Sequence, residues 1–164
     1  KGLIGGTIQD VSQKENGIRR QQILTEKFSG TWALTYTNLK NNFTIDYTGN
    51  IYGPMRLAVL GPLDPRQKNA PIWSIQNILF TFKKFKNIEL YTGLKNILNW
   101  TPNKGNPFII ARADDPFDDN VSFDNNGSAI VTANNPYGLT FDPTYIYAPN
   151  QGRRLFFGLR YNLN

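Results

Sequence analysis

Two carboxylates are the first residues in this 164-residue sequence that could carry out chemistry. Asp46 and Glu89 each stand in a stretch where apolar and polar residues alternate. Two carboxylates that flank a glycosidic bond are the catalytic groups of most glycosidases. That reaction requires a defined separation, and nothing in the sequence brings Asp46 to Glu89. A polar lining explains both residues equally well, so a small glycosidase is a hypothesis with little support and we expect no enzyme.

An acidic cluster could instead hold a divalent cation. Carboxylate oxygens are preferred ligands of Ca²⁺, and the cluster consists of Asp114, Asp115, Asp118, Asp119 and Asp124. Its spacing does not match the calcium loop that has Gly at the sixth position. We therefore expect a solvated loop, with calcium binding as the alternative, and we predict no metal site and no cofactor.

Missing residue types exclude several kinds of function. The chain has no Cys and no His, which removes disulfides, thiolate chemistry, His-assisted proton transfer and the usual zinc sites. Asn-X-Ser/Thr triplets begin at Asn42, Asn99, Asn120 and Asn126, but Asn-rich loops produce such triplets by chance. The net charge of +6 is spread over turns and loops, so we expect no nucleic-acid partner.

Binding chemistry is expected in the loops. Residues 53–71 and 99–151 are rich in Pro, Gly, Asn and Asp. Loops longer than about 12–15 residues are unusual in compact domains and tend to be functional. The candidate ligand-binding residues in these loops are Arg56, Arg66, Trp100 and Arg112.

Alternating strands are predicted to position these loops. Residues 28–37 and 43–52 alternate strictly between apolar and polar side chains and are joined by a short turn at 38–42, which predicts a hairpin. Their length matches the roughly 9–11 residues of a tilted membrane strand. Four further strands are predicted at the ranges 3–13, 73–82, 88–95 and 155–163. No run of about 18 apolar residues predicts a membrane helix.

Two motifs resemble the carboxyl-terminal end of the TonB-dependent outer-membrane receptors. Residues 90–99, LYTGLKNILN, resemble the penultimate strand of that family. The second motif combines FDP at 141–143, YAP at 147–149 and Gly152-Arg153 with FGLRY at 157–161. The order and separation of the two motifs also fit the family. One departure is that Leu163 is followed by Asn164, where such barrels usually end on an aromatic residue.

The resemblance implies a fold and a function. Residues 1–164 would form about six carboxyl-terminal strands of an all-β, antiparallel transmembrane β-barrel of roughly 22 strands, in the outer membrane of a Gram-negative bacterium. The family takes up a scarce nutrient, such as an iron–siderophore, haem, cobalamin or an oligosaccharide. A plug domain inside the barrel transmits energy from the TonB complex. The sequence contains no plug and begins at Lys1 without a signal peptide, so we expect a fragment.

The expected partners follow from the same resemblance. They are the rest of the receptor, meaning its plug and its other barrel strands, the TonB complex acting through the plug, the nutrient ligand, a surface lipoprotein and outer-membrane lipid. The alternative is a soluble all-β carbohydrate-binding module, in which aromatic residues of the two long loops would stack on sugars. A requirement for detergent separates these two hypotheses.

In a barrel, the apolar phase of each strand faces lipid and the polar phase faces the lumen. The lipid-facing prediction comprises Trp32, Leu34, Tyr36, Ile45, Tyr47, Leu90, Leu94, Phe157 and Leu159. The lumen-facing prediction comprises Asp46, Glu89, Lys95 and Arg160. Because a guanidinium facing hydrocarbon is costly, Arg160 needs an acceptor in the lumen: Glu89, a group of the plug, or water.

Loop lengths predict the topology. Loops are long on the outer side of such barrels and short on the periplasmic side. We therefore expect residues 14–27, 53–71 and 99–151 to be extracellular, and the turns at 38–42 and 83–87 to be periplasmic.

Overall fold

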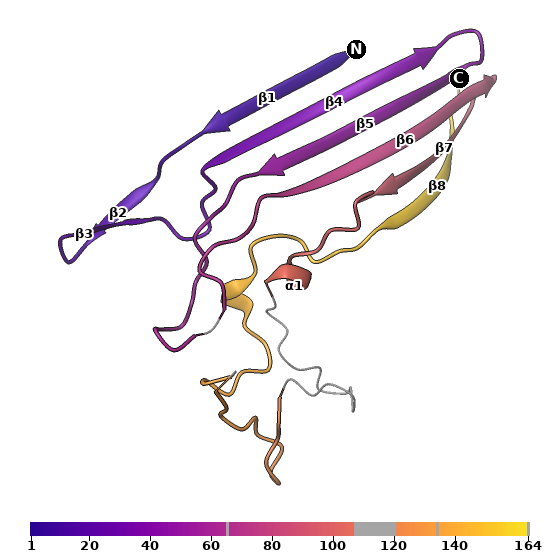
Figure 1. Cartoon of the computed structure of the whole chain (residues 1–164). Helices are drawn as coiled ribbons and strands as arrows, with labels where there is room; N and C mark the ends of the chain where they lie inside the picture. The colour runs from indigo at the N-terminus through magenta and orange to yellow at the C-terminus, as the bar shows by residue number, and fades with distance from the viewer. Residues whose placement is uncertain (65, 107–120, 134, 164) are drawn as a thin grey trace.

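Six strands form one antiparallel sheet in the computed structural model, which describes residues 1–64, 66–106, 121–133 and 135–163. The sheet is open, because β1 and β8 form its two edges (Figure 1). Each neighbouring pair is antiparallel. The strands, in their order across the sheet, are β1 (Gly2–Ile8), β4 (Phe28–Asn38), β5 (Phe43–Tyr52), β6 (Trp73–Phe85), β7 (Ile88–Lys95) and β8 (Arg154–Tyr161). The all-β class and the six predicted strands are confirmed.

The β4–β5 hairpin forms where strict alternation predicted it. Leu34 lies opposite Tyr47, and Tyr36 opposite Ile45, so apolar residues of one strand meet apolar residues of the next. The turn at 39–42 ends on Asn42, whose φ of 53° is left-handed, and asparagine tolerates that conformation better than most residues.

Residues 14–27 were predicted to be a loop, and this prediction is wrong for half of the stretch. The segment contains most of a second, two-stranded sheet, formed by β2 (Ser12–Glu15) and β3 (Ile18–Gln21). Asn16 and Gly17 connect these strands with φ values of 50° and 81°, as a two-residue hairpin turn of type I′ requires.

The β2–β3 hairpin prolongs the β1–β4 pair. The amide of Gln9 donates to the carbonyl of Lys27, and the amide of Gln22 to the carbonyl of Val11, both at 2.9 Å. The ladder therefore continues past Ile8, and Figure 1 shows the hairpin projecting from the end of the sheet where the long loops lie. The predicted strand at 3–13 thus divides into β1 and the beginning of β2.

The β6–β7 turn is shorter than predicted. β6 runs on to Phe85 instead of ending at residue 82, and the register shifts between Phe82 and Phe85. The shift is a bulge that admits an extra residue into one strand. It leaves residues 86–87 as the turn, with Asn87 at a φ of 70°.

A hydrophobic core lies beyond one end of the sheet, where the long loops meet. Its buried members are Met55, Leu57, Ala70, Trp73, Tyr145 and Ala148. The loops also contain α1 (Pro102–Gly105) and the 3₁₀ turn η1 (Pro143–Tyr145). In the described part of the chain, no helix has the length and apolar character needed to cross a membrane.

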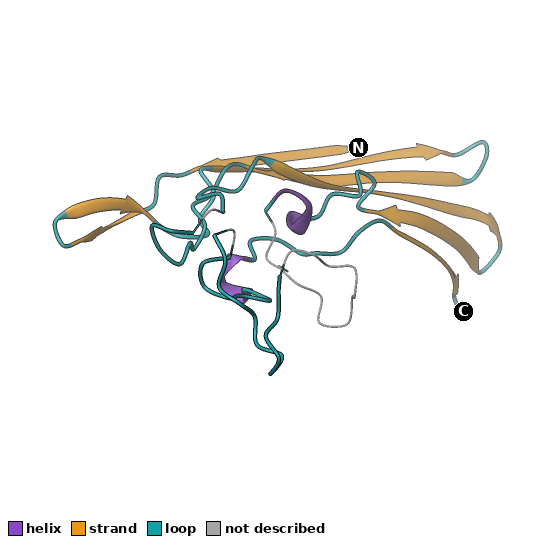
Figure 2. Ribbon diagram, turned by 60° about the horizontal axis from the view of Figure 1, so that its bottom comes forward, coloured by secondary structure: helices purple, strands orange, loops and turns teal. Residues whose placement is uncertain are grey.

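The loops gather on one side of the sheet. Figure 2 shows them below the sheet, and the β7–β8 side of the sheet curls towards the same side. Tyr52 and Trp73 are opposite one another at the loop end of β5 and β6, and their rings stack with centroids 4.3 Å apart. Trp100 stacks on Trp73 in turn, at 4.8 Å and an interplanar angle of 8°. These stacked rings fasten the long loops to the sheet.

Candidate functional site

The strand register assembles a single apolar face. Leu34 pairs with Tyr47, Tyr47 with Ile78, Ile78 with Leu94, and Leu94 with Leu155, so one apolar row crosses five strands. Side chains of residues directly opposite in a sheet share a face. By the same pairings, this face holds all nine residues of the predicted apolar phase: Trp32, Leu34, Tyr36, Ile45, Tyr47, Leu90, Leu94, Phe157 and Leu159.

Much of the apolar face is open. Leu34 is 43% exposed, Leu159 58% and Phe157 86%. Contiguous apolar patches of more than a few hundred Å² are rare on soluble monomers and mark binding or membrane surfaces. Large apolar side chains of this face are exposed on β4, β6, β7 and β8, so the exposure extends across the sheet.

Aromatic residues stand in the middle of the apolar face and at its turn end. In the middle, the Trp32 ring lies over Gly49, where a Cβ would clash with the ring, and the Tyr47 hydroxyl donates to Gln76 at 2.6 Å. The amide of Gln76, which lies opposite Gly49 in the neighbouring row, is therefore satisfied. At the turn end, Phe43 lies 6.1 Å from Tyr36 and 5.3 Å from Phe80, measured between ring centroids.

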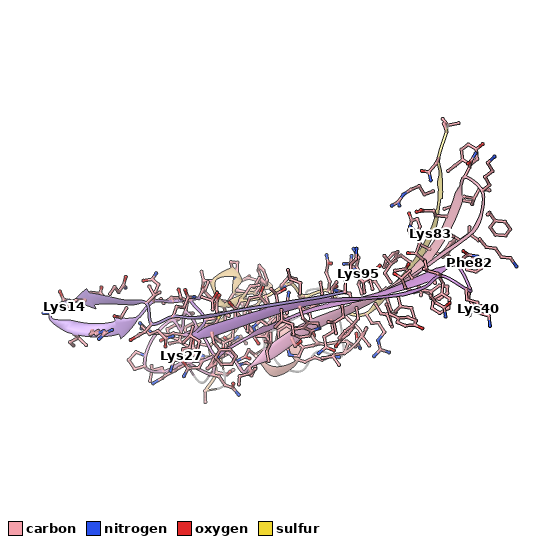
Figure 3. The ribbon with its side chains drawn as sticks, turned by 90° about the horizontal axis from the view of Figure 1, so that it is seen from above. Lys14, Lys27, Lys40, Phe82, Lys83 and Lys95 are labelled. Carbon is pink, nitrogen blue, oxygen red and sulfur yellow. The ribbon has the colours of Figure 1, made fainter. Side chains whose placement is uncertain are left out.

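The opposite face carries the charges. Glu89 pairs with Arg160, and Lys95 with Arg154, while Asp46 pairs with Thr35. These five charged residues alternate with members of the apolar face, so Lys95 and Phe82, both labelled in Figure 3, belong to opposite faces of the sheet. The predicted lumen-facing residues Asp46, Glu89, Lys95 and Arg160 all share this polar face.

Glu89 joins two cations on the polar face. Its Oε2 accepts from Arg160 Nη1 at 2.8 Å, and its Oε1 lies 3.1 Å from Lys83 Nζ. The contact expected between Arg160 and Glu89 is therefore present. Glu89, Lys83 and Arg160 line a groove of about 380 Å³ together with Asp46, which accepts from the Thr35 hydroxyl at 2.6 Å. A carboxylate held by two cations is not the protonated acid that a glycosidase needs.

A buried ion network locks the loops together. The Nη2 of Arg66 lies 2.8 Å from Asp64 Oδ2 and 2.7 Å from Asp142 Oδ2. The side chains of Arg66, Asp64 and Asp142 are 11%, 2% and 5% exposed, and the guanidinium lies 4.2 Å from the centroid of the Tyr145 ring. The network therefore joins residues that are 76 positions apart in the chain.

The network shifts the acidity of its members. The hydrogen bond from Arg66 lowers the pKa of Asp64 to about 2 against the opposing effect of burial. Burial also opposes ionisation of Asp142, but hydrogen bonds from Thr144 and Arg66 together outweigh it and lower that pKa. Both carboxylates are thus held ionised beside the buried guanidinium.

The candidate ligand-binding residues have structural contacts instead. Arg66 belongs to the buried network. Arg56 donates from Nη1 to the carbonyl of Gln21 at 3.1 Å, which ties the loop to β3, and Trp100 stacks on Trp73. Arg112 lies outside the described residues. The sequence did not single out Asp64 and Asp142 as functional residues. The one feature they share in the sequence is that each stands directly before a proline in a long loop.

Of the acidic cluster, only Asp124 lies in the described part of the chain. Its Oδ1 accepts from the amides of Asn126 and Ser128 at 2.9 and 2.8 Å, so it closes a local turn. Asp114, Asp115, Asp118 and Asp119 lie outside the described residues. Among those that are described, no group of three acidic, His or Cys side chains could hold a metal ion.

Similarity to known proteins adds no assignment to this geometry. The resemblance to the TonB-dependent receptors rests on the motifs at 90–99 and 141–161 alone. No protein-family model matches the chain, and no curated protein or solved structure matches it either.

Proposed function

We propose that the sheet is part of the wall of an outer-membrane β-barrel, and that this barrel belongs to a TonB-dependent transporter. The observation that carries the proposal is the division of the two faces. Apolar residues form an exposed row from β4 to β8, while Asp46, Glu89, Lys95, Arg154 and Arg160 all share the other face. Apolar outside and polar inside is the pattern of membrane barrels.

The open edges support a larger barrel. β1 and β8 each present one side without a partner strand in the described part of the chain. Inside a membrane, unpaired backbone groups cost several kcal/mol each. Further strands of the same receptor would pair with both edges and close the barrel, at roughly 22 strands in this family.

The placement of the loops supports the orientation. The loop core packs on Tyr52, Trp73 and Ile75, which belong to the same face as Asp46 and Glu89 because they lie in the same alternating phase of β5 and β6. Loops folded over the polar face would lie at the mouth of the lumen. We assign this end to the cell exterior, and the short turns at 39–42 and 86–87 to the periplasm.

The transport role follows from the motifs. In this proposal the polar face, with its Lys83–Glu89–Arg160 cluster, lines the path of a nutrient and the plug. TonB supplies energy through the plug. A carbohydrate-binding module is less well supported, because Trp73 is buried and covers one face of the Trp100 ring.

Cysteine labelling tests the topology. These 164 residues contain no native Cys, so each substitution creates the single reactive site of this segment, and the receptor without the substitution is the background control. Asn69→Cys and Asn125→Cys should react with a membrane-impermeant maleimide on intact cells, because both positions are exposed in loops assigned to the outside. Lys84→Cys should react only after the outer membrane is permeabilised. Labelling of Lys84→Cys alone on intact cells would invert the topology, and labelling of all three would contradict the barrel.

A further inference from the structure

A groove lies where the apolar face meets the loops. It has a volume of about 450 Å³, and its apolar wall includes Ile51 from β5 with Ile72 and Leu98 from the loops. Ile72 and Leu98 are more than half exposed. Asn99 and Lys104 supply the polar wall. The groove is therefore amphipathic, with exposed aliphatic side chains beside an ammonium group.

Two cations are fixed to one turn beside this groove. Lys104 Nζ donates to the carbonyl of Asn99 at 3.2 Å. Arg153 donates from Nε and Nη2 to the carbonyl of Ile97 at 3.0 and 2.6 Å, and its amide donates to Asn99 Oδ1 at 2.8 Å. Both contacts leave N–H groups of the two side chains available for a ligand.

The charge of the groove is not balanced locally. The described residues that line it include no Asp or Glu, and the side chains of Lys104 and Arg153 donate to backbone carbonyls. Arg153 directly precedes β8 and stands two residues before the exposed Leu155, so it lies near the loop end of that strand. Cations at the border of an apolar face complement an anion that is attached to a hydrocarbon.

We propose that this groove binds the anionic headgroup of an amphipathic lipid whose acyl chains lie along the apolar face. The inference rests on the proposed function, because a barrel in the proposed orientation has this groove at the depth of the lipid headgroups of the outer leaflet. Arg binds phosphate through its planar fork, and Lys acts as a point charge. A free anion would leave the aliphatic wall of Ile51, Ile72 and Leu98 uncovered, so we commit to a lipid.

Quenching by brominated lipids tests the inference. The probes are phosphatidylglycerol and phosphatidylcholine with brominated acyl chains, each titrated into vesicles that contain the protein. Within these 164 residues, a Trp32→Phe background leaves Trp73 and Trp100, which both line the groove; tryptophans elsewhere in the receptor are replaced by Phe. The anionic lipid should quench them at a lower mole fraction than the zwitterionic lipid. The double variant Lys104→Gln/Arg153→Gln should reduce this preference roughly 25-fold, since each surface cation contributes a factor of about five.

Matched variants keep the test specific. Lys14→Gln/Lys40→Gln removes two exposed cations far from the groove and should keep the preference. Arg153→Lys keeps the charge and should retain most of the preference, even if the double variant disturbs the turn. Equal quenching by the two lipids would overturn the inference. Loss of the preference on adding inorganic phosphate would also overturn it, in favour of a site for soluble anions.

Trp32 distinguishes failure of the inference from failure of the proposed function. Trp32 lies on the apolar face opposite Gly49, two residues along β5 from the groove residue Ile51, and does not itself line the groove. With Trp32 present, brominated phosphatidylcholine should quench it whether or not the groove selects anionic lipid. Absence of that quenching would overturn the proposed barrel wall, and the groove proposal with it.

Discussion

If the sheet forms the proposed barrel wall, Leu34→Arg should destabilise the protein in a bilayer by about 2–4 kcal/mol, the cost measured for Arg on the lipid face near the bilayer midplane. Leu34 lies on the apolar face between Trp32 and Tyr36, opposite Tyr47, and is 43% exposed. Lipid would surround the introduced guanidinium, and the neighbouring residues Tyr47 and Gly2 offer no carboxylate. The measurement is the free energy of unfolding in guanidinium chloride. It is made on the protein as the cell makes it, in phospholipid vesicles.

Thr35→Arg is the matched control, because it places the same side chain one residue further along β4. Thr35 lies opposite Asp46 and donates to it at 2.6 Å. The substitution loses that hydrogen bond but gives the guanidinium an acceptor on a polar face, so we expect a change of less than about 1 kcal/mol. Equal losses at the two positions would show that the assigned faces are wrong.

Arg66→Met should destabilise the packed loops by about 3–5 kcal/mol, the usual cost of removing one partner of a buried ion pair. The side chains of Asp64 and Asp142 are almost fully buried, so their two negative charges would remain without the guanidinium. Hydrogen exchange can measure the loss of stability at the amides of Leu57 and Ala70. These amides donate to the carbonyls of Lys68 and Met55 across the loop. The exchange rates should be corrected for the intrinsic effect of pH.

The network also predicts a pH dependence. In the native protein the pKa of Asp64 is lowered from 3.8 to about 2, and that of Asp142 is also lowered. The stability that these groups contribute is therefore complete above about pH 4 and is lost as the pH falls towards about 2. In Arg66→Met the sign reverses, because burial without a cation favours the protonated acids. The loops of this variant should become more stable as the pH falls from 7 to 4.

A triple variant provides the control for the ion network. Asp64→Asn/Arg66→Met/Asp142→Asn removes all three charges and should recover much of the stability lost in Arg66→Met, because no uncompensated charge stays buried. Its stability should not change between pH 4 and 7. If Arg66→Met alone were as stable as the native protein at pH 7, this result would show that solvent reaches the two carboxylates and that the network does not hold the loops.

Alternation predicted the sheet well, since one face of each strand is apolar. β4, β5 and β7 follow their predicted ranges closely, and the two phases of these strands separate onto two faces. The contact between Arg160 and Glu89 could also be predicted, because adjacent strands of like phase bring their polar residues together.

The β2–β3 hairpin could not be predicted from alternation. Its strands, SQKE and IRRQ, carry polar residues in both phases, so neither has an apolar face. The local signal was the Asn16-Gly17 turn, and the ladder that continues from β1 and β4 supplies the remaining order.

The loop network was missed for a different reason. Arg66 and Asp142 are 76 residues apart, and no periodic pattern relates them. A lone Arg in a long loop looks the same in sequence whether it binds a ligand or a buried carboxylate. Only the packing of the two loops on each other distinguishes these roles, and it places Arg66 and Arg56 among structural residues.

The central claim is that one face of the sheet contacts lipid and the other contacts water, and spin labelling along β4 tests it most directly. Single nitroxides at positions 31–36 of the protein in phospholipid vesicles would be compared for collisions with oxygen, which concentrates in lipid, and with a water-soluble nickel chelate. We expect a period of two, with 32, 34 and 36 favouring oxygen and 31, 33 and 35 favouring nickel. Equal access of nickel to both phases would contradict the membrane wall.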